Sequence, residues 1–148
     1  MSSCCRTLTL LNQPRRTDIE TSRPDRQSPI CVIVAEDNDD LRMVMPPLIN
    51  ESPDLHCPAT TAMLDEVAPL IEQYQAKVAV LDIELRGGSA LKILPSLRQQ
   101  FPATKFIIHS GHSNPELIRN ARALGADGYV LKSGDFDELI EAIRKLAL

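Results

Sequence analysis

The chain has 148 residues, of which 43% are hydrophobic, 24% charged and 3% aromatic. This length suits one domain, and the hydrophobic fraction excludes a chain that is disordered throughout. The scarcity of aromatic residues argues against a protein that stacks many nucleobases. The net charge of −4 disfavours contact with a nucleic-acid backbone, and no run approaches the roughly 20 apolar residues of a membrane span.

The first 29 residues differ in composition from the rest. Residues 1–29 are rich in Ser, Thr, Arg, Gln and Pro and show no sustained apolar period. Such a segment cannot bury enough apolar surface to offset the entropy of ordering it, and it lacks the apolar core of a signal peptide. We therefore expect residues 1–29 to be a flexible tail and residues 30–148 to form the folded domain.

The cysteines fit neither a zinc site nor a disulfide framework, because their spacing lacks paired motifs. They are Cys4, Cys5, Cys31 and Cys57. Free thiols in a reducing cytosol are the expected state, which points to a cytoplasmic protein.

Five short apolar runs are typical of strands that are buried on both faces of a sheet. In chain order they cover residues 30–35, 55–60, 77–82, 105–108 and 129–131. Pro58 interrupts the second run. We therefore expect that strand at a sheet edge, because proline cannot donate a hydrogen bond to a neighbouring strand.

Apolar residues at helical spacing follow each run and predict five helices, near residues 41–49, 63–75, 91–97, 117–124 and 136–146. Pro46 and Pro47 predict a kink or break in the first helix. A capping box is expected where Ser113 precedes Glu116, and a second one at Asp135. The alternation of strands and helices predicts an α/β fold with a doubly wound, five-stranded parallel sheet.

Polar side chains stand where the predicted strands end. They are Glu36 and Asp37, Asp82, Ser110, and Lys132. Open parallel sheets bind ligands at this edge. Carboxylates that lie close together repel each other unless a hard cation such as Mg²⁺ joins them. Because a hydroxyl and an ammonium donate to phosphoryl oxygens and a carboxylate can attack phosphorus, the set indicates phosphoryl transfer to an aspartate.

From Ile30 to Leu148 the sequence resembles a receiver domain of the two-component response regulators. The segments that carry the resemblance are Ile-Val-Ala-Glu36-Asp37-Asn, Val-Leu-Asp82-Ile-Glu, Ile-Ile-His-Ser110-Gly and Gly-Ala-Asp-Gly-Tyr129-Val-Leu-Lys132. The resemblance implies a flavodoxin-like (βα)5 fold with strand order 2-1-3-4-5, in which residues 30–148 are the receiver domain.

The resemblance also implies roles for the residues at the strand ends. Asp82 would accept a phosphoryl group, and Ser110 and Lys132 would contact its oxygens. Tyr129 would change rotamer as Ser110 shifts, whereas His109 is expected to pack rather than react. The implied Mg²⁺ ligands are Glu36, Asp37, Asp82 and the backbone carbonyl of Glu84.

The implied partners are other signalling proteins. A sensor histidine kinase or a histidine phosphotransfer protein would supply the phosphoryl group. A downstream protein would dock on the face formed by the fourth helix, fifth strand and fifth helix, and phosphorylation could also produce a homodimer. We expect a bacterial, cytoplasmic protein that is not an enzyme and contacts neither nucleic acid nor membrane directly.

Some positions near the implied site depart from the family pattern. Arg86 stands where the family usually has Pro, and Ala90 where it usually has Gly, so both alter the loop after Asp82. Glu84 and His112 occupy positions that tune attack of water on the acyl phosphate, and we hypothesise that they affect dephosphorylation. An ordinary loop residue is the alternative interpretation of His112.

The chain ends at Leu148, at the predicted last helix, so the leading interpretation is a stand-alone receiver. A receiver fragment of a longer DNA-binding transcriptional regulator is one alternative, and a phosphorylation-independent pseudo-receiver that binds partners is another. An aspartyl-phosphate hydrolase is disfavoured, because such enzymes resemble Asp-x-Asp where this chain has Asp82-Ile83-Glu84.

Overall fold

The structure, a computed structural model, describes residues 28–148. The tail predicted for residues 1–29 therefore lies almost entirely outside the described residues. Strand β1 (Ile30–Ala35) begins where the sequence predicts the first strand.

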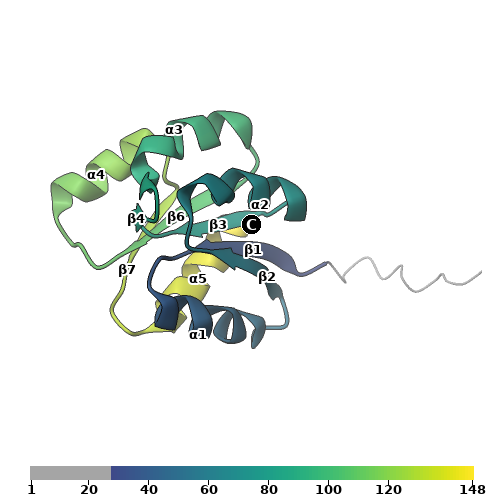
Figure 1. Cartoon of the computed structure of the whole chain (residues 1–148). Coiled ribbons are helices and arrows are strands. Elements are labelled where there is room, and N and C mark those ends of the chain that lie inside the picture. Colours follow the sequence, from purple (N-terminus) through teal and green to yellow (C-terminus); the bar gives the residue numbers. More distant parts are fainter. Residues whose placement is uncertain (1–27) are drawn as a thin grey trace, which may run out of the picture.

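A five-stranded parallel sheet forms the centre of the fold, in the order β2-β1-β3-β6-β7 (Figure 1). Because β6 and β7 are the fourth and fifth strands of this sheet along the chain, the order is 2-1-3-4-5. The predicted strand order is confirmed. The other strands are β2 (Leu55–Thr61), β3 (Val78–Leu81), β6 (Lys105–Ser110) and β7 (Gly128–Leu131). Strand β2 lies at the edge as predicted, and its register against β1 shifts between Cys31 and Ile33, next to Pro58. A bulge thus accommodates the proline at the sheet edge.

Helices cover both faces of the sheet (Figure 1). Helices α1 (Asp39–Asn50) and α5 (Phe136–Ala147) lie on one face. The 3₁₀ turn η2 (Leu64–Glu66) and the helices α2 (Val67–Tyr74), α3 (Ala90–Gln100) and α4 (Pro115–Leu124) lie on the other. Strand β6, between β3 and the edge strand β7, contributes to both cores, because Phe106 and Ile108 pack toward α3 while Ile107 packs toward α5.

A small antiparallel hairpin, β4 (Glu84–Leu85) with β5 (Gly88–Ser89), follows β3. The sequence predicts only a glycine-containing loop here. Gly87 has φ = 108°, a backbone conformation that residues with a Cβ rarely adopt, so glycine at this position permits the tight turn. The hairpin therefore gives the segment after Asp82 a defined shape.

Two local predictions need correction. The break predicted at Pro46 and Pro47 is absent, because α1 continues through both prolines with Met45 and Ile49 buried against the sheet. At the start of α4 the capping residue is Asn114, not Ser113. The Asn114 side chain accepts hydrogen bonds from two backbone amides of the first turn. Pro115 is therefore the first helical residue, one position later than a cap at Ser113 would give.

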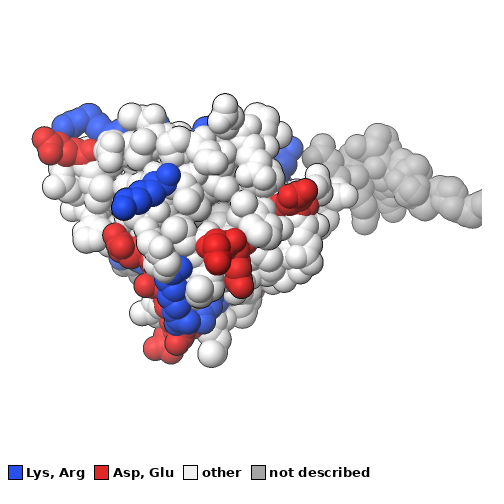
Figure 2. Space-filling view, turned by 45° about the horizontal axis from the view of Figure 1, so that its top comes forward, with Lys and Arg blue, Asp and Glu red and all other residues white. Residues whose placement is uncertain are grey.

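Charged side chains of both signs lie in small groups on the face shown in Figure 2. In that view no broad basic patch covers the described residues. This face therefore lacks the extended cationic surface that commonly holds a nucleic-acid backbone.

No helix in residues 28–148 is long and apolar enough to cross a membrane.

Candidate functional site

Three carboxylates meet where β1 and β3 end. The strands pair in parallel with Ala35 opposite Leu81, so Glu36 and Asp82 follow neighbouring residues of the sheet. The Asp82 amide N–H donates to the Ala35 carbonyl at 2.9 Å, which fixes the start of the loop. Carboxylate oxygens of Glu36, Asp37 and Asp82 all lie within 4.8 Å of one another. The parallel sheet therefore produces the acidic cluster that the strand ends predict.

One ammonium group balances part of this charge. Lys132 follows β7, and its Nζ lies 3.0 Å from Glu36 Oε1 and 3.1 Å from Asp82 Oδ2. Its backbone N–H donates to the Ser110 carbonyl at 2.8 Å, which anchors the end of β7 against β6. Glu36 is 1% exposed and Asp82 is 9% exposed, so protein groups replace water around both carboxylates. Besides Lys132, Glu36 has the Asn38 amide, which donates to its Oε2 at 3.0 Å.

Burial and mutual repulsion shift the ionisation of the cluster. Burial raises the pKa of Asp82, and the Glu36 carboxylate adds to the rise while Lys132 opposes it. Burial and the Asp82 carboxylate likewise raise the pKa of Asp37. Burial acts against the Lys132 ammonium, but the Glu36 and Asp82 carboxylates outweigh it and raise its pKa. The cluster thus holds more negative charge than one lysine neutralises.

The donor set fits a hard divalent cation. Three carboxylates within 4.8 Å offer oxygen atoms only, and Mg²⁺ prefers oxygen ligands and relieves carboxylate repulsion. Glu84 begins β4 with an exposed side chain, which agrees with its predicted contribution through the backbone carbonyl alone. That contribution stays a prediction.

The two predicted switch residues are connected through a third residue. Ser110 is 1% exposed at the end of β6, and its Oγ accepts a hydrogen bond from the His112 amide at 3.0 Å. The Tyr129 hydroxyl donates to the His112 carbonyl at 2.8 Å. Ser110 and Tyr129 therefore hold opposite ends of one residue in the loop before α4.

The departures from the family pattern lie in the hairpin region. Ala90 is fully buried at the start of α3, where its methyl group is part of the core. Arg86 is half exposed, and its guanidinium lies 2.9 Å from Asp39 Oδ1. No sequence pattern predicts this pair, because the two residues are 47 positions apart.

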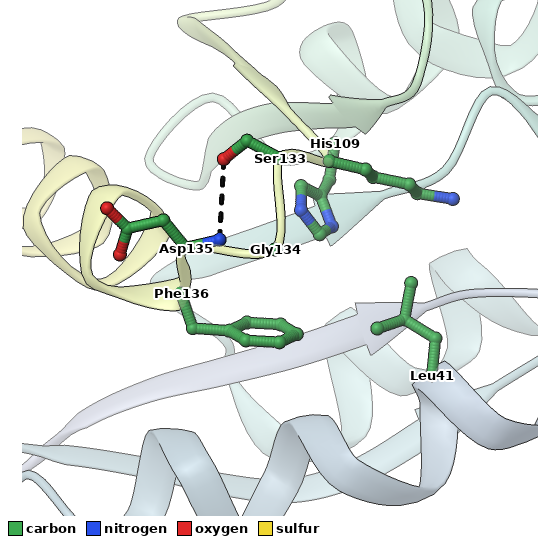
Figure 3. Close-up of a pocket in the computed structure, with 7 residues that line it drawn as sticks. Leu41, His109, Ser133, Gly134, Asp135 and Phe136 are labelled. Atoms are coloured by element: carbon green, nitrogen blue, oxygen red, sulfur yellow. Dashed lines mark hydrogen bonds between the residues drawn. The ribbon is translucent and has the colours of Figure 1, made fainter.

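A pocket of about 220 Å³ (Figure 3) is lined in part by Lys132, the residue that contacts the acidic cluster. His109 borders it from β6, with Leu41 and Phe136 on the opposite side. His109 is 4% exposed, its Nδ1 has no hydrogen-bond partner among the described residues, and its ring centre lies 6.4 Å from that of Phe136. Burial, with the Lys132 charge, lowers its pKa to about 4. His109 therefore packs as a neutral residue, in line with the prediction.

Comparisons with known proteins agree with this geometry. The family described as response regulator receiver domain matches residues 32–144. The chain is 26% identical over 121 residues to the nitrate/nitrite response regulator protein NarL of Escherichia coli strain K12, covering 82% of this chain and 56% of that protein. It thus spans about half the length of the curated relatives it matches.

Solved structures show the same relationship. A DNA-binding response regulator of the LuxR family from Staphylococcus aureus matches with a TM-score of 0.74 and 34% identity, over 80% of this chain and 99% of that chain. A two-component response regulator of the LuxR family from Aurantimonas sp. SI85-9A1 matches with a TM-score of 0.75 and 27% identity, over 81% of this chain and 86% of that chain.

Proposed function

Because the chain belongs to the response regulator receiver domain family, we propose that it is a two-component signalling module in which Asp82 accepts a phosphoryl group. The observation that carries the proposal is the position of Lys132, whose Nζ contacts both Glu36 and Asp82 within a cluster of three carboxylates. The donor would be a phosphohistidine on a sensor histidine kinase or on a histidine phosphotransfer protein.

In the proposed transfer, an oxygen of the ionised Asp82 carboxylate bonds to phosphorus while the P–N bond to the donor imidazole breaks. The imidazole keeps the electron pair of that bond and takes a proton. Lys132 already lies beside Asp82 and would donate to the phosphoryl oxygens. Ser110 Oγ would donate as well, using the proton that its contact with the His112 amide leaves free.

The cofactor in this proposal is Mg²⁺, which suits an oxygen-only donor set and commonly binds phosphate oxygens together with one or two carboxylates. When bound, it would neutralise negative charge on the transferring group. The proposed ligands are Glu36, Asp37, Asp82 and the backbone carbonyl of Glu84.

The proposed output is a change in a protein-binding surface formed by α4, β7 and α5. A phosphoryl group that draws the Ser110 hydroxyl toward Asp82 would disturb the hydrogen bond between Ser110 and the His112 amide. The His112 carbonyl in turn accepts the hydrogen bond of the Tyr129 hydroxyl. The rotamer of Tyr129 would then report phosphorylation to a downstream protein or to a second copy of the chain. We also propose that Glu84 and His112 affect the rate of dephosphorylation.

A second candidate is the receiver portion of a longer DNA-binding regulator. The observation that favours it is the length of the match, since this chain aligns with only 56% of NarL. In that case the downstream partner would be a domain of the same protein, and only that domain would contact DNA. For residues 28–148 themselves we propose no contact with nucleic acid or membrane, no enzymatic activity in their own right, and a cytoplasmic location.

The proposal can be tested by incubating the full chain with acetyl phosphate and following intact mass, with Mg²⁺ or with a chelator. A phosphoryl adduct is expected only with Mg²⁺ and is expected to be absent in Asp82→Ala. Asp40→Ala is the matched control, because Asp40 is exposed in the first turn of α1. An adduct on Asp82→Ala, or none on the unmodified chain, would contradict the proposal, and the latter would favour a phosphorylation-independent pseudo-receiver.

A further inference from the structure

We propose that Arg86 is a positioning residue, which pairs with Asp39 and thereby holds the hairpin after Asp82 in place relative to the loop after β1. This inference rests on the proposed function, because it concerns how two separate segments present oxygen ligands to one Mg²⁺. Both segments must keep a fixed relative placement for the cluster to bind a cation well.

The pair belongs to a continuous chain of polar contacts that starts in the metal-binding segment itself. The carbonyl of Glu36 accepts a hydrogen bond from Arg42 Nη1 at 2.9 Å. Arg42 Nη2 lies 2.6 Å from Asp39 Oδ1, and the same oxygen lies 2.9 Å from Arg86 Nη2. One carboxylate oxygen therefore joins two guanidinium groups, one from α1 and one from the hairpin.

The backbone of Arg86 is fixed on its other side by the segment that follows β2. Its N–H donates to the Ala62 carbonyl at 2.9 Å, and its carbonyl accepts from the Leu64 amide at 2.8 Å. A parallel bridge to Met63 completes this attachment. The hairpin is therefore held by its backbone toward β2 and by its Arg86 side chain toward α1, with Glu84 two residues before Arg86.

This arrangement gives a physical role to a departure from the family pattern. Proline restricts the backbone of a loop through its ring, whereas Arg86 restricts this loop through a contact between distant segments. The pair is exposed, with 52% of the Arg86 side chain and 66% of the Asp39 side chain accessible. Exposed ion pairs contribute modestly and are screened by salt, so we expect an effect on Mg²⁺ affinity of about two- to fivefold.

Simple electrostatics predicts a different pattern, which makes the inference testable. If Arg86 and Asp39 acted only as charges near the cation, removing the arginine would tighten Mg²⁺ binding and removing the aspartate would weaken it. The two effects would then add in the double variant. If the pair positions the hairpin, each single substitution weakens binding, and the double variant is no weaker than the weaker single variant.

The experiment titrates the full chain with MgCl₂ at constant ionic strength and follows backbone amide shifts by NMR, with acetyl phosphate absent. The variants are Arg86→Ala, Asp39→Ala and the double variant, and Arg119→Ala is the control because Arg119 is an exposed arginine in α4. Thermal melting of each variant confirms that it is folded.

The expected result is weaker binding by about two- to fivefold in all three Arg86 and Asp39 variants, with Arg119→Ala unchanged and the differences reduced at high salt. Opposite and additive effects of the single substitutions, or no effect from either, would overturn the inference alone. A failure of the unmodified chain to bind Mg²⁺ would overturn the proposed function, and with it this inference.

Discussion

Buried polar groups lie on both sides of Lys132, charged carboxylates on one side and a neutral imidazole on the other. Toward β1 and β3, the Glu36 and Asp82 carboxylates share the Lys132 ammonium at 3.0 and 3.1 Å. Toward α5, His109 borders the pocket of Figure 3. Its Nδ1 has no hydrogen-bond partner in residues 28–148, and burial lowers the pKa of the ring to about 4. A buried group therefore keeps its charge here only where an opposite charge lies in contact with it.

This difference separates the candidate site from the apolar surroundings of His109. His109 and Ser110 are adjacent on β6, and both are nearly inaccessible. Yet His109 lies toward apolar Leu41 and Phe136, whereas the acidic cluster contains charges that a single lysine does not fully neutralise. Burial alone thus does not identify a site at this sheet edge, but incompletely balanced charge does.

Removing the Lys132 ammonium from the acidic cluster is expected to have the largest effect on stability. In Lys132→Ala the Glu36 and Asp82 carboxylates would remain buried without a cation, so we expect the free energy of unfolding to fall by about 3 to 5 kcal/mol. Urea denaturation with a chelator present measures this. Lys92→Ala, at an exposed position of α3, is the control, and equal stability of the two variants would contradict the account.

Acidification is expected to destabilise the fold through the buried, neutral His109. His109 binds a proton near its ordinary pKa of 6.5 in the unfolded chain but only near 4 in the folded protein. The unfolded state therefore holds more protons between these values, so the stability contributed by neutral His109 is lost as the pH falls through that window, up to about 3 kcal/mol.

His109→Leu isolates this term from the titration of the carboxylates. Urea unfolding of both proteins between about pH 7 and about pH 4.5 is expected to show a steeper loss of stability in the unmodified chain. Parallel curves would show that folding does not lower the pKa of His109.

The ionisation of the acidic cluster is expected to make Mg²⁺ affinity depend on pH. Since burial raises the pKa of Asp82 and of Asp37, protons compete with Mg²⁺ at a higher pH than they would at ordinary aspartates. We expect Mg²⁺ affinity to decrease as the solution is acidified, beginning above the usual aspartate range. Titration with MgCl₂ at a series of pH values measures this, and an affinity that stays constant down to that range would argue against a buried carboxylate site.

The smallest expected effect concerns the link between Ser110 and Tyr129. Tyr129→Phe removes the hydrogen bond to the His112 carbonyl and should lower the free energy of unfolding by about 1 kcal/mol or less. Tyr74→Phe is the control, because no hydrogen bond of the Tyr74 hydroxyl is found in residues 28–148. Equal changes in the two variants would show that the His112 contact adds nothing specific.

Much of the candidate site could be predicted because parallel strands bring their carboxyl ends to one edge. Apolar runs identify β1, β3, β6 and β7, and the residues that follow them are then placed near one another by topology alone. The convergence of Glu36, Asp37, Asp82 and Lys132 follows from this rule and needs no knowledge of individual side-chain contacts.

Other features depend on packing that the sequence does not display. The prolines of α1 remain helical because Met45 and Ile49 are buried, which outweighs local propensity. The contact between Arg86 and Asp39 joins residues that are distant along the chain. The β4–β5 hairpin and the pocket at His109 likewise arise from the tertiary arrangement, so residue patterns gave no signal for them.

The most direct test of the central claim locates the phosphoryl group on the chain. The full protein is incubated with acetyl phosphate and Mg²⁺, the acyl phosphate is reduced with borohydride to an alcohol, and the peptides are sequenced by mass spectrometry. The account predicts homoserine at position 82 only, and only when Mg²⁺ was present. Reduction at Glu36, Asp37 or another carboxylate while Asp82 stays unmodified would contradict it.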